Sequence, residues 1–370
     1  MPTVHWFYAD SDGRHALASE SRSHTRAQWA LGVPAVMVWG TGWFTRRLRL
    51  VVLTHTNAAL LLGTSCVCAG ILYGIAHTDW GRQRLQSLRS APDPGAAVEI
   101  WRDDPQLGYA HRASSTGSHH TLDFSVRYTI DQDGCRVIPG VRARQDSVLF
   151  LGDSFTFGHG VDDAQTFSAV LSAEYWPRVE IRNCGVMGWS TGQAYLLLEQ
   201  TLAGARLPTA IVYGWTGATL QRNHLRSSWL FALAAHRRRS VHFDLAGENL
   251  EYRGTVGPEE AILDDAPDLP ERELAVTRAL ITRMARMCAR DSVGFLVVLL
   301  ATRQSDDVMG DWLRDQGAAQ AIEVLDLRSV RGPYFRNDGH PKQAWHGAIA
   351  RALADQAPQR IGVGSGPSVQ

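Results

Sequence analysis

Five short apolar runs, each typical of a buried strand, recur from residue 147 onward and alternate with helix-like stretches. The runs lie at 147–151, 178–182, 209–213, 293–300 and 322–327, and the helix-like stretches near 165–175, 191–203, 271–290, 306–316 and 341–355. Strands that alternate with helices predict an open parallel sheet covered by helices on both faces. Side chains that follow the carboxyl end of a strand in such a sheet lie where ligands bind. The chain is therefore predicted to be an α/β protein with a five-stranded parallel sheet.

Two segments do not fit the alternation. Residues 222–270 are predicted to be an insertion, in which "RSSWLFALAAHRRRS" forms a helix over the site and "GPEEAILDDAPDLPE" an acidic loop. The stretch "DFSVRYTIDQDGCRVIP" alternates polar and apolar residues on both sides of Asp133-Gly134, which predicts a short β-hairpin.

The segment before the folded domain contains an apolar run. Residues 50–76 carry no charged side chain apart from a charge on His55, and are long enough to span a bilayer. They predict a single transmembrane helix, between a polar and basic segment at 1–49 and a linker at 77–99; the alternative is a buried helix of a soluble domain. Basic residues at 46–49 favour a cytoplasmic start, so the domain at 100–356 is expected in the periplasm or outside the cell. Residues 357–370 are expected to be a disordered tail.

Charge and cysteine spacing exclude several classes of protein. Lys plus Arg and Asp plus Glu both number 37, so no net positive field attracts nucleic acid. The five cysteines are scattered, which indicates neither a zinc site nor a disulfide framework. No GxGxxG or Walker loop supports nucleotide binding. We therefore predict no metal, no cofactor and no nucleic-acid partner.

Ser154 is a candidate nucleophile because it directly follows the first predicted strand, in "VLFLGDSFTFGHGV". A serine here has two interpretations, the N-cap of the next helix or a nucleophile at the carboxyl edge of the sheet. A nucleophile needs a base. His340, in the loop "NDGHP" before the last helix, is the candidate base, and Asp338 beside it is the candidate partner that orients its ring.

Three stretches together resemble the SGNH (GDSL-type) hydrolases across about residues 100–356. They are Gly152-Asp153-Ser154, "NCGVMGWSTGQ" after the second strand, and Asp-Gly-His-Pro before the final helix. The resemblance implies a flavodoxin-like three-layer fold and acyl-ester chemistry, with Ser154 attacking an acyl carbon and His340 as base. It also implies an oxyanion hole made by the backbone N–H groups of Ser154 and Gly188, with Gly185 as second choice. The substrate expected by analogy is an O-acyl group on an envelope glycan.

The chain departs from the family's pattern after its third predicted strand. Ala218 stands where the family has an oxyanion-hole asparagine. Loss of such a donor costs about 10²- to 10³-fold in rate. Thr216, Thr219 and Asn223 are candidate replacements.

The second departure concerns the acid. The family's usual acid lies three residues before the histidine, where this chain has Asn337, so Asp338 is the preferred partner of His340. His159, Trp189 and Trp215 are candidate cleft residues; the alternative for His159 is a solvated position in its loop, and for the two tryptophans a packing role. These departures keep a second function in view, a catalytically impaired domain that binds a glycan or scaffolds an envelope complex.

Overall fold

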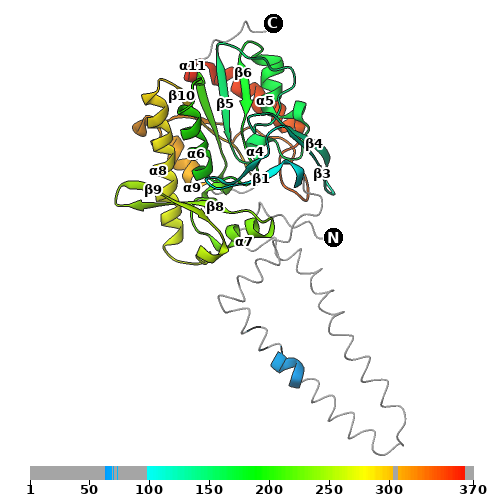
Figure 1. Cartoon of the computed structure of the whole chain (residues 1–370), viewed down its shortest axis with the longest axis vertical. Coiled ribbons are helices and arrows are strands. Elements are labelled where there is room, and N and C mark those ends of the chain that lie inside the picture. Colours follow the sequence, from blue (N-terminus) through cyan, green and yellow to red (C-terminus); the bar gives the residue numbers. More distant parts are fainter. Residues whose placement is uncertain (1–62, 69, 71–72, 74–97, 303–306, 363–370) are drawn as a thin grey trace, which may run out of the picture. The chain divides into compact units, whose positions relative to one another are not determined.

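The computed structural model describes residues 63–68, 70, 73, 98–302 and 307–362 (Figure 1). Residues 63–68, 70 and 73 are helical and exposed. They belong to a separate unit from the fold that begins at residue 98, and each is described by itself. Most of the predicted transmembrane helix at 50–76, the segment 1–49 and almost all of the linker 77–99 lie outside the described residues, as does most of the predicted tail. No helix within the described ranges has the length and hydropathy needed to cross a membrane.

A five-stranded parallel sheet forms the centre of the fold (Figure 1). Its strands are β5 (Ser147–Gly152), β6 (Glu180–Asn183), β7 (Ala210–Trp215), β10 (Gly294–Leu299) and β11 (Glu323–Asp326). The order across the sheet is β11-β10-β7-β5-β6, and every pairing is parallel. The predicted five-stranded parallel sheet is confirmed. In chain order these strands run 2-1-3-4-5, the flavodoxin-like order, in which ligands bind where the winding reverses, beyond the carboxyl ends of β5 and β7.

Helices cover both faces of this sheet because its central strands are apolar on both sides. β5 and β7 are buried along their whole length. Val148 and Phe150 pack in the core that contains α5 (Phe167–Val170), α10 (Gln343–Gln356) and α11 (Pro358–Ile361). Leu149 and Leu151 point to the opposite core, with α6 (Thr191–Leu202), α8 (Leu269–Arg290) and α9 (Val308–Gln316). The result is a three-layer α/β arrangement.

Three antiparallel hairpins and several short helices complete the described fold. The hairpins pair β1 (Trp101–Asp104) with β2 (Gly108–His111), β3 (Ser115–His120) with β4 (Ser125–Ile130), and β8 (Ser240–Ala246) with β9 (Asn249–Val256). The short helices are η2 (Val98–Ile100), α4 (Ser154–Phe157), η3 (Asp163–Gln165), η4 (Leu171–Tyr175), η5 (Gly217–Arg222), α7 (Ser227–Ala235), η6 (Pro258–Glu260) and η7 (Ala318–Gln320).

Two sequence predictions need correction here. The strand before Asp133-Gly134 pairs along its length with β3, and the predicted hairpin is reduced to a single bridge between Ile130 and Arg136. The insertion at 222–270 contains the expected helix, α7, but it continues into the β8–β9 hairpin, which was not predicted.

Cys135 and Cys184 form a disulfide, although the scattered cysteine spacing indicated none. The two residues are 49 positions apart in the chain. They meet because the turn after β4 lies against the end of β6, where the Arg136 N–H donates to the Asn183 carbonyl at 2.7 Å. Only tertiary structure brings them together, so spacing alone could not reveal the bond.

Candidate active site

Ser154 is the first residue of the one-turn helix α4, and the N-cap of that helix is Asp153. The Asp153 carboxylate accepts a hydrogen bond from the Phe155 N–H at 2.9 Å. Capping by the aspartate leaves the serine hydroxyl free for another partner. The turn follows β5 directly, so the hydroxyl lies at the carboxyl edge of the sheet.

His340 is the partner of that hydroxyl. Its Nε2 lies 2.8 Å from Ser154 Oγ, and its Nδ1 lies 2.6 Å from Asp338 Oδ1. The same carboxylate oxygen accepts the backbone N–H of His340 at 3.1 Å. A carboxylate only accepts, so Nδ1 carries a proton and Nε2 can accept the serine proton. Ser154, His340 and Asp338 therefore form a continuous hydrogen-bonded chain.

The carboxylate in this chain belongs to Asp338 and not to its neighbour. Asn337 turns away, since its side-chain amide and its backbone N–H donate to Asp123 at 2.9 and 2.7 Å. Burial acts to raise the pKa of Asp338, but the imidazoles of His340 and His159 outweigh it and hold the pKa well below its usual range. Asp338 is thus ionised at neutral pH. Asp123 was not expected from the sequence, because in "TLDF" it looks like an ordinary turn residue.

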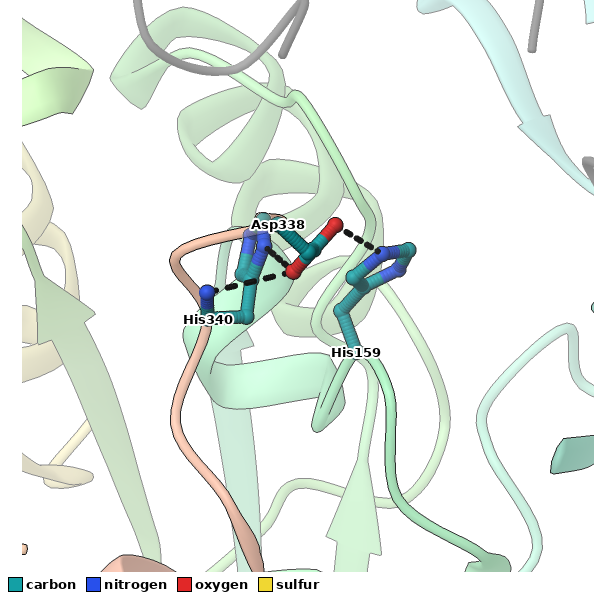
Figure 2. Close-up of side chains that lie close together, drawn as sticks. All are labelled: His159, Asp338 and His340. Atoms are coloured by element: carbon teal, nitrogen blue, oxygen red, sulfur yellow. Dashed lines mark hydrogen bonds and ion pairs between the residues drawn. The ribbon is translucent and has the colours of Figure 1, made fainter. Parts of the chain in front are cut away.

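His159 contacts the other oxygen of Asp338, as Figure 2 shows, with Nε2 at 3.2 Å from Oδ2. The residue is only 3 % exposed. Burial lowers the pKa of His159, against the raising effect of Asp338, so the ring is neutral at neutral pH. His159 therefore does not line an open cleft. It is buried and contacts Asp338 on the oxygen that His340 does not use.

The backbone N–H groups expected to form an oxyanion hole come from two segments. The loop after β6 is held beside the end of β5 by the Val186 N–H, which donates to the Gly152 carbonyl at 3.0 Å. Gly188, in this loop, has a φ of 80°, a conformation that favours glycine. Within the described part of the chain, the backbone N–H groups of Ser154 and Gly188 have no protein acceptor. The Gly185 N–H, by contrast, donates to the Asn183 side chain at 3.1 Å.

The hydroxyls proposed to replace the missing oxyanion asparagine point to Asp153. Thr216 Oγ1 donates to the Asp153 carboxylate at 2.8 Å, and Thr219 Oγ1 at 3.4 Å. Arg222 pairs with the same carboxylate at 3.0 Å and is itself buried. Thr219 is therefore part of a polar network around Asp153, the residue that precedes Ser154.

Asn223 and the two tryptophans are also engaged elsewhere. The Asn223 side chain accepts the Thr191 N–H at 2.7 Å and donates to Thr277 at 2.7 Å. Trp215 is fully buried, and its indole N–H donates to Asp307 at 3.1 Å. Trp189 is buried as well, and its indole donates to the Tyr109 carbonyl at 3.1 Å. The predicted aromatic cleft walls are thus packing residues.

Three side chains of this cluster are of types that can bind a metal ion. Among the described residues, one group of three His, Cys, Asp or Glu side chains has all of its potential ligand atoms within 4.8 Å of one another. It consists of His159, Asp338 and His340. Direct hydrogen bonds of 2.6 and 3.2 Å through Asp338 account for their proximity. The three side chains thus form a hydrogen-bonded cluster in which both imidazoles donate to the Asp338 carboxylate.

Access to the hydroxyl is restricted in this structure. Ser154 and His340 are both 0 % exposed. A cavity of about 750 Å³ lies at the carboxyl ends of β10 and β11, lined by Leu300, Thr302, Asp307 and Arg328 among others, and neither Ser154 nor His340 lines it. Neighbouring groups therefore cover both Ser154 and His340 in this structure.

Fold and site together define an α/β protein with a Ser-His-Asp chain at the carboxyl edge of a parallel sheet. No protein-family model and no curated protein matches the sequence. Among solved structures, the chain is similar to a member of the lipolytic G-D-S-L family from Veillonella parvula, with 13% identity over 58% of this chain and 98% of that one, and a TM-score of 0.38. It is also similar to a carbohydrate acetylesterase family member from Sinorhizobium meliloti, with 13% identity over 59% of this chain and 100% of that one, and a TM-score of 0.35.

Proposed function

We propose that the protein is a serine esterase of SGNH/GDSL type, or an acyltransferase that uses the same acyl-enzyme chemistry. The observation that carries the proposal is the chain from Ser154 Oγ to His340 Nε2 at 2.8 Å and from His340 Nδ1 to Asp338 at 2.6 Å. It supports the proposal because a nucleophile, a base and an acid of this kind must each lie within hydrogen-bond reach of the next.

The acylation half of the reaction begins with the serine. Ser154 Oγ attacks the acyl carbon while its proton passes to His340 Nε2. The charge of Asp338 stabilises the imidazolium that forms. As the tetrahedral intermediate collapses, the bond to the alcohol breaks, and His340 returns the proton to the leaving alkoxide. The products are an acyl-enzyme on Ser154 and a free alcohol.

Deacylation repeats these steps with a second nucleophile. His340 removes a proton from water, or from an acceptor hydroxyl in the transferase case, and the resulting oxygen attacks the acyl carbon. Collapse then breaks the bond to Ser154, whose oxygen takes the proton back from His340. The enzyme is regenerated, and the acyl group leaves as an acid or a new ester.

The backbone N–H groups of Ser154 and Gly188 are the donors proposed for the developing oxyanion. Preorganised donors of this kind stabilise negative charge strongly where water is excluded. A third donor is not supplied by Thr219 or Asn223, whose polar atoms are bonded elsewhere. The proposed enzyme therefore works with two donors, and a rate about 10²- to 10³-fold below a three-donor site is expected.

We propose an O-acyl group on an envelope glycan as the substrate, and a location outside the cytoplasm with residues 50–76 as a membrane anchor. The location is supported by the Cys135–Cys184 disulfide, because such bonds persist in oxidising compartments. The substrate class rests on the sequence resemblance and on this location. Membrane fractionation, with protease added to intact and to permeabilised cells, tests the anchor and the side on which the domain lies.

Serine labelling tests the chemistry directly. A fluorophosphonate probe should label the wild type, and Ser154→Ala should abolish both labelling and hydrolysis of p-nitrophenyl acetate. His340→Ala should lose both as well, since the hydroxyl then has no base. An active Ser154→Ala variant, or a wild type that takes no label, would rule out the esterase.

A second function, a catalytically impaired domain that binds a glycan, is favoured by one observation. Ala218 stands at the donor position, and the hydroxyls around it face Asp153 instead. Under this alternative, the wild type takes no probe label. Acylated and deacylated envelope glycans should both bind the wild type, and each should bind the Ser154→Ala variant with unchanged affinity.

A further inference from the structure

We infer that His159 is a positioning residue for the acid of the site, a second histidine that holds Asp338 so that its other oxygen faces His340. The inference rests on the proposed function and goes beyond it, since the reaction as proposed uses only Ser154, His340 and Asp338. The His159 ring packs against the His340 ring, with 4.5 Å between the centroids, and its Nε2 contacts Asp338. Figure 2 shows the carboxylate between the two rings. Oδ2 meets His159 Nε2 at 3.2 Å, and Oδ1 meets His340 Nδ1 at 2.6 Å.

The protonation of His159 follows from its partner. The ionised carboxylate only accepts, so His159 Nε2 carries the proton of this hydrogen bond. His159 therefore fixes the Oδ2 end of Asp338, and rotation of the carboxylate away from His340 would break three hydrogen bonds, one on Oδ2 and two on Oδ1. A carboxylate held at one end only is free to turn, and a misaligned acid leaves the base in the wrong tautomer.

The loop that carries His159 is shaped to place the ring. Gly160 has a φ of 85°, and a Cβ added there would lie 2.6 Å from the Phe335 ring, on the segment that leads to Asp338. The buried Arg136 guanidinium donates to the carbonyls of Phe157 at 2.8 Å and Gly158 at 2.6 Å, immediately before His159. These charge-assisted hydrogen bonds from Arg136 hold the loop before His159 in one conformation.

His159 also connects the acid to the proposed oxyanion loop. Its Nδ1 lies 2.7 Å from Met187 Sδ, and Met187 directly precedes Gly188. The ring is thus packed between the segment that carries Asp338 and the segment that carries a proposed backbone donor. Other charged or titratable groups near this cluster are Asp123, which accepts the Asp338 N–H, and Arg136, Tyr128 and His119, which surround His159.

Two substitutions separate the hydrogen bond from simple packing. The amide nitrogen of His159→Gln falls where Nε2 lies, so this variant keeps the donor to Asp338, whereas the shorter His159→Asn cannot reach it. We expect His159→Asn and His159→Phe to lower kcat about 10- to 100-fold, the effect of losing a hydrogen bond to a charged group, with KM little changed. His159→Gln should restore most of kcat. His111→Gln is the matched control, since it replaces another buried imidazole that does not contact Asp338.

The pH profile gives a readout that a packing role would not move. Without the donor on Oδ2, the carboxylate can turn away from His340, and the protonated form of His340 then loses the stabilisation that the Asp338 charge gives it. The acidic limb of kcat/KM should therefore move to lower pH by about one unit in His159→Asn and His159→Phe, and not in His159→Gln or His111→Gln.

A measurement without turnover keeps this inference separate from the proposed function. The low-field proton resonance of the His340–Asp338 hydrogen bond should be present in the wild type and in His159→Gln, and displaced or lost in His159→Asn. This result together with an inactive wild type would refute the esterase and leave the role of His159 standing. The inference would be overturned if the wild type is active and His159→Asn leaves kcat, the acidic limb and the resonance unchanged. Loss of wild-type activity on treatment with a chelator would also overturn it, because the three side chains would then be metal ligands.

Discussion

The carboxylate of Asp153 and the guanidinium of Arg222 lie 3.0 Å apart, both almost fully buried, at the N-cap of the helix α4 that begins with Ser154. Asp153 is the residue before the proposed nucleophile, and Arg222 ends the short helix η5 after β7. The pair therefore joins the ends of β5 and β7, the two strands between which the winding of the sheet reverses. The pair thereby stabilises the position of these two strand ends next to Ser154.

Removal of Arg222 should destabilise the fold more than removal of a surface arginine. Arg222→Met leaves the buried Asp153 carboxylate without its counter-charge, and breaking a buried pair in this way costs about 3–5 kcal/mol. The free energy of unfolding, measured with urea, should fall by this amount. The double variant Arg222→Met with Asp153→Asn should recover part of the loss, because it removes the uncompensated charge. A single variant as stable as the wild type would show that the pair contributes nothing.

The sequence predicted the sheet well because its signals are local. Each strand is a continuous apolar run ended by turn residues, and the periodic helices between them leave few alternative topologies. Ser154, His340 and Asp338 were predictable for the same reason, since each lies in a loop at the end of such an element. The structure then brings all three together through hydrogen bonds of 2.8 and 2.6 Å.

The support around these residues was not predictable, because every part of it depends on distant contacts. Asp123 lies 214 positions before Asn337, and the Cys135–Cys184 bond and the Asp153–Arg222 pair link segments that only the folded chain brings together. Thr219 and Asn223 were assigned to the oxyanion hole from their places in the chain, but their partners are set by neighbouring strands and helices. Both side chains stabilise the surroundings of the site through these hydrogen bonds.

Acid should destabilise the protein through its buried histidines. Burial lowers the pKa of His111 and of His346 to about 3. In the unfolded chain each titrates near 6.5, so below that pH the unfolded state binds more protons and stability falls, by about 3 kcal/mol for each residue at pH 4. Urea unfolding between pH 7 and pH 4 should show this slope, and the double variant His111→Gln, His346→Gln should flatten it. An unchanged slope in the double variant would contradict the assignment.

The Cys135–Cys184 disulfide should stabilise the domain chiefly by restricting the unfolded chain. For a closed loop of this length, with 49 residues of sequence separation, the chain-entropy model gives about 4 kcal/mol. Cys135→Ser with Cys184→Ser, or reduction of the wild type, should lower the unfolding free energy by up to this amount. Thiol titration of the denatured, unreduced protein gives an independent check, since three of the five cysteines are free. Titration of all five would disprove the bond.

Substitution of the proposed acid discriminates between the two neighbouring residues of the "NDGHP" loop. In Asp338→Asn, the side-chain amide can donate to His340 Nδ1, which moves the ring proton to Nε2 and leaves no acceptor for the Ser154 hydroxyl. A loss of about 10⁴-fold in kcat is expected from this change of tautomer, with the fold retained. Asn337→Ala should cost far less, because the Asn337 side chain bonds Asp123 and not His340. Steady-state hydrolysis of p-nitrophenyl acetate measures kcat for both variants. An equal loss in the two would refute Asp338 as the acid, because the geometry of the loop, and not the carboxylate, would then control His340.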